Sequence, residues 1–203
     1  MFNIFKNNPL KLIEKTHQLI IDLPSTTQLI NLLMPFDYSV IKTEYLEMAQ
    51  IRGTCVHKQI EEYILFGKEA KCDHDIKTHL VQGEKGIAFY QSKIEEIEKE
   101  YGSMEKFPEI SLFSNEFRGS IDLLLMNDKY VFIIDWKTTS KINHEKENLQ
   151  TYMYSKLVSF WINNPKVIKR FTFNTNKNKL TEYDDFSIVE NQYQQCLNLY
   201  KFS

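Results

Sequence analysis

The chain has 203 residues, of which 42% are hydrophobic and 26% charged, and its formal net charge is −2. This length and composition suit a folded globular domain and exclude a wholly disordered chain. No apolar run approaches the roughly 18 residues that span a bilayer, so we expect no membrane contact. The net charge does not favour a nucleic-acid binder, although a whole-chain value can conceal a local basic patch.

The N-terminal segment and the cysteines indicate the compartment. Residues 1–23 contain no compact apolar stretch with a cleavage site, and the acidic Glu14 and Asp22 do not suit a transit peptide. We therefore interpret residues 1–23 as an N-terminal extension of a single domain that spans residues 1–203. The three cysteines are irregularly spaced, which favours a reducing, intracellular compartment and excludes a four-cysteine iron–sulfur cluster.

Hydrophobic periodicity predicts a mixed α/β domain. In chain order, helical spacing covers residues 26–34 after the candidate N-cap Ser25, then 53–66, 86–101, 148–161 and 187–200. After Pro108 the period changes to about two, which predicts strands over 109–117, 118–126 and 130–137 and a hairpin over 166–174 and 179–186. This order of elements predicts one central sheet flanked by helices.

Two carboxylates and a lysine stand out in two neighbouring predicted strands. In YVFIIDWK, Asp135 and Lys137 are two residues apart, so they project from one face of a strand while Trp136 points to the other. Alone, such a pair is usually an ordinary ion pair. Asp122 lies in the preceding strand, however, and two converging carboxylates repel each other unless a cation lies between them. Oxygen ligands of this kind suit Mg²⁺ or Mn²⁺, and a lysine beside them suits phosphodiester hydrolysis.

Further polar residues recur at helical spacing. His57 and Glu61 are four residues apart on one predicted helix, and Gln150 and Tyr154 are four apart on another. Each pair, taken alone, is more often part of an ordinary helix surface than of a site. Gly119, just before Asp122, permits a close approach of the backbone.

Taken together, these motifs resemble a known family. RG-x-x-V-H-x-x-I-E-x-Y, G-S-I-D, IIDWKT and Q-x-x-x-Y follow one another along the chain, and the similarity covers roughly residues 23–154. The set resembles the PD-(D/E)xK nuclease superfamily and, within it, the RecB-like branch. It is most similar to the mitochondrial genome-maintenance exonuclease and to related phage and bacterial nucleases. The resemblance implies a restriction-endonuclease-like α/β core with a central mixed sheet flanked by helices.

The resemblance also implies roles for matching residues. It makes His57, Asp122 and Asp135 metal ligands, and the backbone carbonyl of Trp136 completes the protein's share of the metal shell. Lys137 is the implied catalytic lysine. The expected cofactor is one or two Mg²⁺ or Mn²⁺ ions, without an iron–sulfur cluster.

Other residues have supporting roles by the same resemblance. Gln150 and Tyr154 line the cleft and steady the active site or the nucleic-acid strand. Glu61 matches a helix glutamate of the family and is expected to support the ligands. The glutamate that this family often carries before the first aspartate is either Glu109 or Glu116, and the sequence does not choose between them.

The function implied by the resemblance is a metal-dependent deoxyribonuclease. We expect an exonuclease that acts on single-stranded DNA or on free ends in repair, replication or recombination, alone or with protein partners. It would be cytoplasmic in a bacterial or phage setting, or mitochondrial. The alternatives are an endonuclease or flap nuclease, a nuclease-derived DNA-binding subunit without turnover, and a structural α/β domain with an ion pair at a strand end.

A local excess of positive charge follows the predicted catalytic strand. Residues 137–180 contain nine lysines and arginines against two glutamates. Such an excess is as often an ordinary solvated surface, but its place directly after the predicted catalytic strand favours a surface that faces phosphate.

Overall fold

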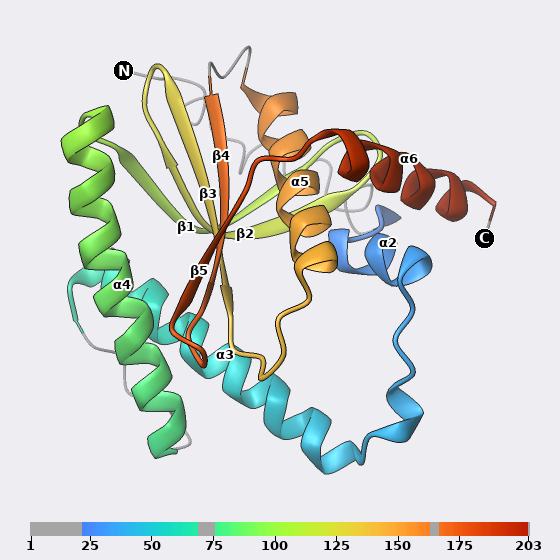
Figure 1. Ribbon diagram of the computed structural model, residues 1–203, viewed down its shortest axis with the longest axis horizontal. Helices are drawn as coiled ribbons and strands as arrows, with labels where there is room; N and C mark the ends of the chain where they lie inside the picture. The colour runs from blue at the N-terminus through green and yellow to red at the C-terminus, as the bar shows by residue number, and fades with distance from the viewer. Residues whose placement is uncertain (1–21, 69–75, 163–166, 203) are drawn as a thin grey trace.

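The computed structural model describes residues 22–68, 76–162 and 167–202 and is built around one five-stranded sheet (Figure 1). Most of the predicted N-terminal extension lies outside the described residues. The strands are β1 (Glu105–Phe113), β2 (Arg118–Met126), β3 (Tyr130–Lys137), β4 (Val167–Asn174) and β5 (Lys179–Tyr183), and they are ordered in the sheet as in the chain. All neighbouring strands are antiparallel except β3 and β4, which are parallel.

Helices cover both faces of this sheet (Figure 1). They are α2 (Thr26–Leu33), α3 (Thr43–Phe66), α4 (Lys77–Tyr101), α5 (His144–Trp161) and α6 (Ser187–Lys201), with a short 3₁₀ helix η1 (Tyr38–Val40). The helices α3 and α4 pack on one face, and α2, α5 and α6 pack on the other. The structure thus confirms the predicted α/β class with a central mixed sheet. Among the described residues, no helix combines the length and apolar character that crossing a bilayer requires.

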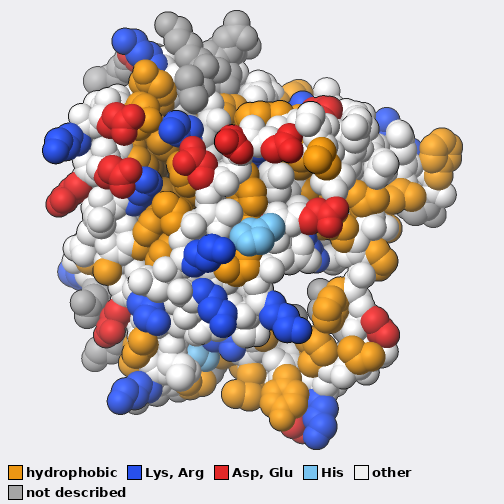
Figure 2. Space-filling model, viewed as in Figure 1, with side chains coloured by type: hydrophobic (Ala, Val, Ile, Leu, Met, Phe, Trp, Pro, Cys, Tyr) orange, Lys and Arg blue, Asp and Glu red, His pale blue; other side chains and the backbone are white. Residues whose placement is uncertain are grey.

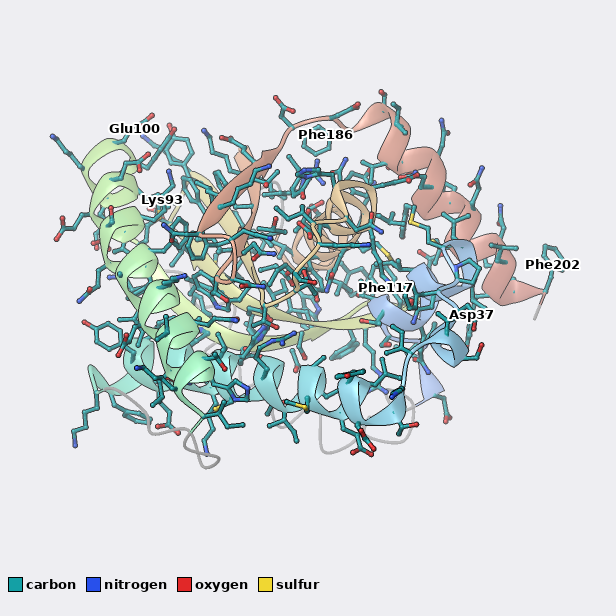
Figure 3. The ribbon with its side chains drawn as sticks, turned by 60° about the horizontal axis from the view of Figure 1, so that its bottom comes forward. Asp37, Lys93, Glu100, Phe117, Phe186 and Phe202 are labelled. Atoms are coloured by element: carbon teal, nitrogen blue, oxygen red, sulfur yellow. The ribbon has the colours of Figure 1, made fainter. Side chains whose placement is uncertain are left out.

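Alternate residues of the central strands divide between two hydrophobic cores. In β2, Leu123 and Leu125 face α3 and α4, whereas Leu124 and Met126 face the α5 side. A sheet that is buried on both faces explains why β2 and β3 are almost continuously apolar. Figure 3 shows how side chains fill both layers, with Phe117 directed inward. The two cores hold β2 and β3, which carry Asp122, Asp135 and Lys137, from both sides.

The predicted helix starts differ from the observed ones at two glycines. The helix expected near Gly53 begins at Thr43, and the helix expected at Gly86 begins at Lys77. Gly86 lies where α4 crosses α3, and a β-carbon there would come within 2.3 Å of the Ile60 Cδ1 atom. This glycine therefore allows close helix packing and does not mark a helix boundary. The α2 prediction is confirmed, because Ser25 forms a reciprocal capping box with the third residue of the helix.

The first strand also begins earlier than predicted. β1 starts at Glu105 and ends at Phe113, and a turn occupies residues 114–117. The Ser114 hydroxyl oxygen stabilises this turn by accepting hydrogen bonds from the Glu116 and Phe117 amides at 3.2 and 3.3 Å. Pro108 lies inside β1 and does not break it, because β1 is an edge strand and has an open side for a residue without an N–H.

The contact between α3 and α4 yields a stability prediction. We expect Gly86→Ala to lower the free energy of unfolding by about 1–3 kcal/mol, because the added methyl group overpacks the contact with Ile60. In urea unfolding experiments, the loss should be smaller when Ile60→Ala is already present, since the second substitution vacates the clashing volume. Strictly additive losses in the double variant would contradict this assignment.

Candidate metal and catalytic site

The site begins where β2 and β3 separate. Their backbone pairing ends at the pair Leu123 and Ile134, and the same register continued by one residue would set Asp122 opposite Asp135. At this point the Asp122 Oδ2 atom accepts a 2.6 Å hydrogen bond from the Trp136 amide. A side chain of β2 thus satisfies the amide, and both carboxylates are held at the opening between the strands.

Three different elements bring His57, Glu109 and Asp122 together. The His57 Nδ1 atom, on α3, lies 3.4 Å from Asp122 Oδ1 and 3.5 Å from Glu109 Oε1. One potential ligand atom from each of the three residues lies within 4.8 Å of the other two. β1 and β2 pair Pro108 with Leu123 and Ile110 with Ile121, so Glu109 and Asp122 lie between these two pairs. The arrangement is a candidate His/Glu/Asp metal site.

Glu109 has an unusual backbone conformation. Its φ is +47°, in the left-handed region that L-residues other than asparagine and aspartate rarely adopt. Such a conformation costs on the order of 1–3 kcal/mol and is often found at functional sites. The strain at Glu109 coincides with its position beside His57 and Asp122.

Asp135 and Lys137 form the second half of the site. Their side chains share one face of β3, as predicted, and Lys137 Nζ lies 2.5 Å from Asp135 Oδ2. Lys137 Nζ also donates a 2.8 Å hydrogen bond to Gln150 Oε1, and Gln150 Nε2 donates to the Tyr154 hydroxyl at 2.8 Å. The predicted i, i+4 pair on α5 is therefore a hydrogen-bonded chain that ends on the lysine.

Trp136 and Gly119 support the site from opposite sides. The Trp136 ring is buried in the core on the α3 and α4 side, with ring centroids 5.9 Å from Phe89 and 6.3 Å from Phe173. A β-carbon on Gly119 would lie 2.9 Å from the Tyr154 ring, so the glycine permits α5 to approach β2 closely. Both sequence predictions, the inward tryptophan and the close approach, are confirmed.

Burial and mutual charge shift the pKa values of the site. Burial opposes protonation of His57, but the carboxylates of Asp122 and Glu109 outweigh it and hold the pKa of His57 well above its ordinary value. Burial raises the pKa of Asp135 to about 6; Lys137 opposes this shift and Asp122 adds to it. Burial also opposes the charge of Lys137, but Asp135 and Asp122 hold the pKa of the lysine above its usual range. The carboxylates thus stabilise the positively charged forms of His57 and Lys137.

The remaining predicted residues lie at different distances from this group. The structure brings Glu109 to the site. Glu116 lies instead in the turn after β1, where its carboxylate accepts a 3.1 Å hydrogen bond from the Tyr193 hydroxyl. Glu61 lies one turn beyond His57 on α3, and burial together with the charge of Glu109 raises its pKa. Of the two glutamates that the sequence left open, Glu109 is the one that lies beside His57 and Asp122.

One buried carboxylate near the site was not singled out by its sequence. Glu147 of α5 accepts hydrogen bonds from the Thr172 hydroxyl at 2.9 Å and the Tyr183 hydroxyl at 3.0 Å. Thr172 is paired with Asp135 across β3 and β4. The only sequence signal was the position of Glu147 three residues before Gln150, on nearly the same face of α5.

The positive charges predicted after β3 do not form one surface. Lys156 and Lys169 form ion pairs with Glu190 and Glu182, and Arg170 is fully buried. Among the basic residues of this segment that the structure describes, the exposed ones are Lys141, Lys177 and Lys179.

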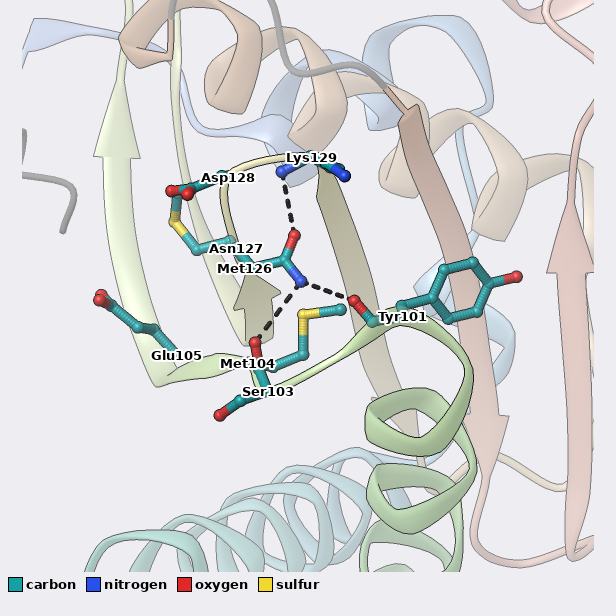
Figure 4. A pocket seen from close by; sticks show the side chains of 8 residues that line it. All are labelled: Tyr101, Ser103, Met104, Glu105, Met126, Asn127, Asp128 and Lys129. Carbon is teal, nitrogen blue, oxygen red and sulfur yellow. Dashed lines mark hydrogen bonds between the residues drawn. The ribbon is translucent and has the colours of Figure 1, made fainter.

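A separate pocket lies at the other end of β2 and β3 (Figure 4). The Asn127 Nδ2 atom in this pocket donates to the Tyr101 and Ser103 carbonyls at 3.0 and 3.5 Å, and its Oδ1 atom accepts from the Lys129 amide at 3.0 Å. These bonds hold the β2–β3 turn against the end of α4, and no residue of the candidate site lines the pocket. Its polar groups serve the fold.

Comparison with known proteins identifies the family of this chain. No curated protein matches the chain. Among solved structures, 20 chains match, and one of them, the crystal structure of SSO0001, is 13% identical with a TM-score of 0.36 over 77% of this chain and 88% of that one. The family model of the PD-(D/E)XK nuclease superfamily matches residues 36–199. Because this match spans most of the chain and contains the whole site from His57 to Tyr154, the chain belongs to the PD-(D/E)XK nuclease superfamily.

Proposed function

We propose that this protein is a divalent-metal-dependent deoxyribonuclease of the RecB-like branch, and that it acts as an exonuclease on single-stranded DNA with free ends. The observation that carries this proposal is the convergence of His57, Glu109 and Asp122 beside the Asp135–Lys137 pair. The resemblance of the motifs around His57, Asp122 and Asp135 to those of the mitochondrial genome-maintenance exonuclease is the reason for proposing single-stranded DNA with free ends as the substrate.

The residues present fit a hard divalent cation. The donor set is one imidazole and three carboxylates. This set suits Mn²⁺, and because most of its ligand atoms are oxygens it also suits Mg²⁺. Within the described residues, the buried Oδ2 atom of Asp135 makes no hydrogen bond and has only the ion pair with Lys137. We assign His57, Asp122, Asp135 and the Trp136 carbonyl as ligands, and we add Glu109 to them because of its position.

The chain's own groups then have defined tasks. A bound cation would lower the pKa of a water and offset charge on the scissile phosphate. The Lys137 ammonium, kept charged by the carboxylates, donates hydrogen bonds to phosphate oxygens as negative charge develops. Gln150 fixes the direction of that ammonium, and Tyr154 fixes Gln150. Burial and the charge of Asp135 raise the pKa of Tyr154 well above its ordinary value, so its hydroxyl stays protonated.

We expect cleavage of end-labelled single-stranded DNA in Mg²⁺ or Mn²⁺ and none in EDTA. The cation is needed because several carboxylates face the phosphate, and they would repel it without one. Electrophoresis of the products measures the cleavage, and restoring the metal after EDTA treatment is the control. Undiminished cleavage in EDTA would contradict a metal-dependent mechanism.

Circular single strands separate the exonuclease from its alternative. An exonuclease degrades the linear form and leaves a circular strand of the same sequence intact. An endonuclease that cuts internally degrades both forms, and a flap nuclease cuts at a junction. DNA binding without turnover at any Mg²⁺ or Mn²⁺ concentration would instead indicate a nuclease-derived binding subunit.

A further inference from the structure

Two loops beside the site are bonded into one unit. They follow the parallel strands β3 and β4, whose carboxyl ends lie next to each other. The Thr175 amide donates a 2.8 Å hydrogen bond to the Lys137 carbonyl, and Asn174 Nδ2 donates to the Thr139 carbonyl at 3.0 Å. The Thr175 hydroxyl also donates to Gln82 Oε1 on α4 at 3.2 Å. The loop after β3 and the β4–β5 turn are thus fixed to the strand that carries the catalytic lysine.

Three exposed lysines project from this unit. Lys141 lies in the loop after β3, and Lys177 and Lys179 lie in and just after the β4–β5 turn. Bonds between side chains and the backbone fix two of these positions: the Thr139 hydroxyl donates to the Lys141 carbonyl at 2.8 Å, and the Lys177 amide donates to Asn174 Oδ1 at 2.8 Å. Their ammonium groups are therefore presented from a structured surface.

The charge of these lysines is not offset nearby. Residues 136–143 and 172–181, which contain both loops, include no aspartate or glutamate. Within the described part of the chain, Lys141, Lys177 and Lys179 form no ion pair, in contrast to Lys156 and Lys169. Figure 2 shows Lys and Arg side chains gathered in the lower middle of the face that it draws, in the region of the β4–β5 turn. A rigid, uncompensated positive surface next to Lys137 suits a polyanion.

We propose that Lys141, Lys177 and Lys179 bind phosphates of the substrate strand on one side of the scissile bond, so that this two-loop surface holds the strand during cleavage. This inference rests on the proposed nuclease function and adds to it the path of the strand. Contacts to phosphate position a nucleic acid without reading its bases, so the surface contributes affinity without sequence preference. Each neutralised phosphate adds about −0.7 to the slope of log affinity against log salt for a single strand, so three lysines contribute about −2.

The test is the triple variant Lys141→Gln, Lys177→Gln and Lys179→Gln. Its matched control replaces Lys99, Lys129 and Lys201 with glutamine, which removes the same charge from exposed positions on α4, the β2–β3 turn and α6. Fluorescence anisotropy with a labelled single strand of about 20 nucleotides, in EDTA at several salt concentrations, measures binding without cleavage. A parallel assay with Mg²⁺ or Mn²⁺ gives KM and kcat.

We expect the two-loop variant to bind at least about tenfold more weakly at low salt, with a salt slope shallower by about 2 and a rise in KM that exceeds any fall in kcat. The control variant should bind as tightly as the wild type. The difference in affinity between the two-loop variant and the wild type should narrow as the oligonucleotide is shortened. Equal binding by the two variants would overturn the proposed strand path. It would not contradict the nuclease function, if the wild type cleaves DNA. Absence of cleavage by the wild type, with weaker binding only in the two-loop variant, would instead refute the nuclease function and leave the surface assigned.

Discussion

Replacing Lys137 with alanine is expected to lower kcat/KM for metal-dependent DNA cleavage by about 10²–10³-fold or to background. This factor is the loss expected when an active site loses one preorganised hydrogen-bond donor to developing negative charge. The reason is geometric, because Lys137 is the ammonium that Gln150 holds beside Asp135. Cleavage of an end-labelled strand at saturating Mg²⁺ or Mn²⁺ measures the loss, and Lys129→Ala, at the other end of β3, is the matched control.

A second substitution keeps this prediction separate from a folding defect. Lys137→Ala leaves the buried Asp135 without its ion pair, so the apoprotein is expected to be less stable. Lys137→Arg keeps a cation for Asp135 but moves the charge, so stability should recover while activity stays low. If Lys137→Ala cleaves as fast as the wild type, the catalytic role of the lysine is refuted.

Glu109→Gln is expected to weaken Mn²⁺ binding by more than the roughly 10–100-fold typical of residues that only orient ligands, and to reduce cleavage in parallel. The reason is its place in the group with His57 and Asp122, reached through a strained backbone. Isothermal titration calorimetry of the wild type and the variant measures the loss.

Glu116→Gln is the matched control, since the sequence allowed either glutamate and the structure places Glu116 against Tyr193. It removes the same charge seven residues away and should keep both metal affinity and cleavage. Equal losses in the two variants would mean that overall charge, and not the position of Glu109, decides metal binding.

Much of the fold could be predicted from local sequence. The predicted ranges of β2 and β3 coincide with the observed ones, because an apolar run bounded by turn residues signals a strand buried on both faces. The errors occurred at helix starts, among them Gly86, where glycine serves in helix packing, and at the start of β1, where an edge position accommodates Pro108. Neighbouring helices and strands decide such cases, and a single-sequence pattern does not contain them.

The sequence by itself determined the chemical types of the site and its spacings within each element. Asp135 and Lys137 share a face because strand side chains alternate, and Gln150 contacts Tyr154 because helix residues four apart are neighbours. Only the tertiary structure decided which residues from distant elements meet: Glu109 lies beside His57 and Asp122 while Glu116 contacts Tyr193, and the loops after β3 and β4 bond to each other. The physical reason is that a carboxylate or an ammonium acts over a few ångströms, and those distances arise only when β2 and β3 separate and the loops after β3 and β4 bond to each other.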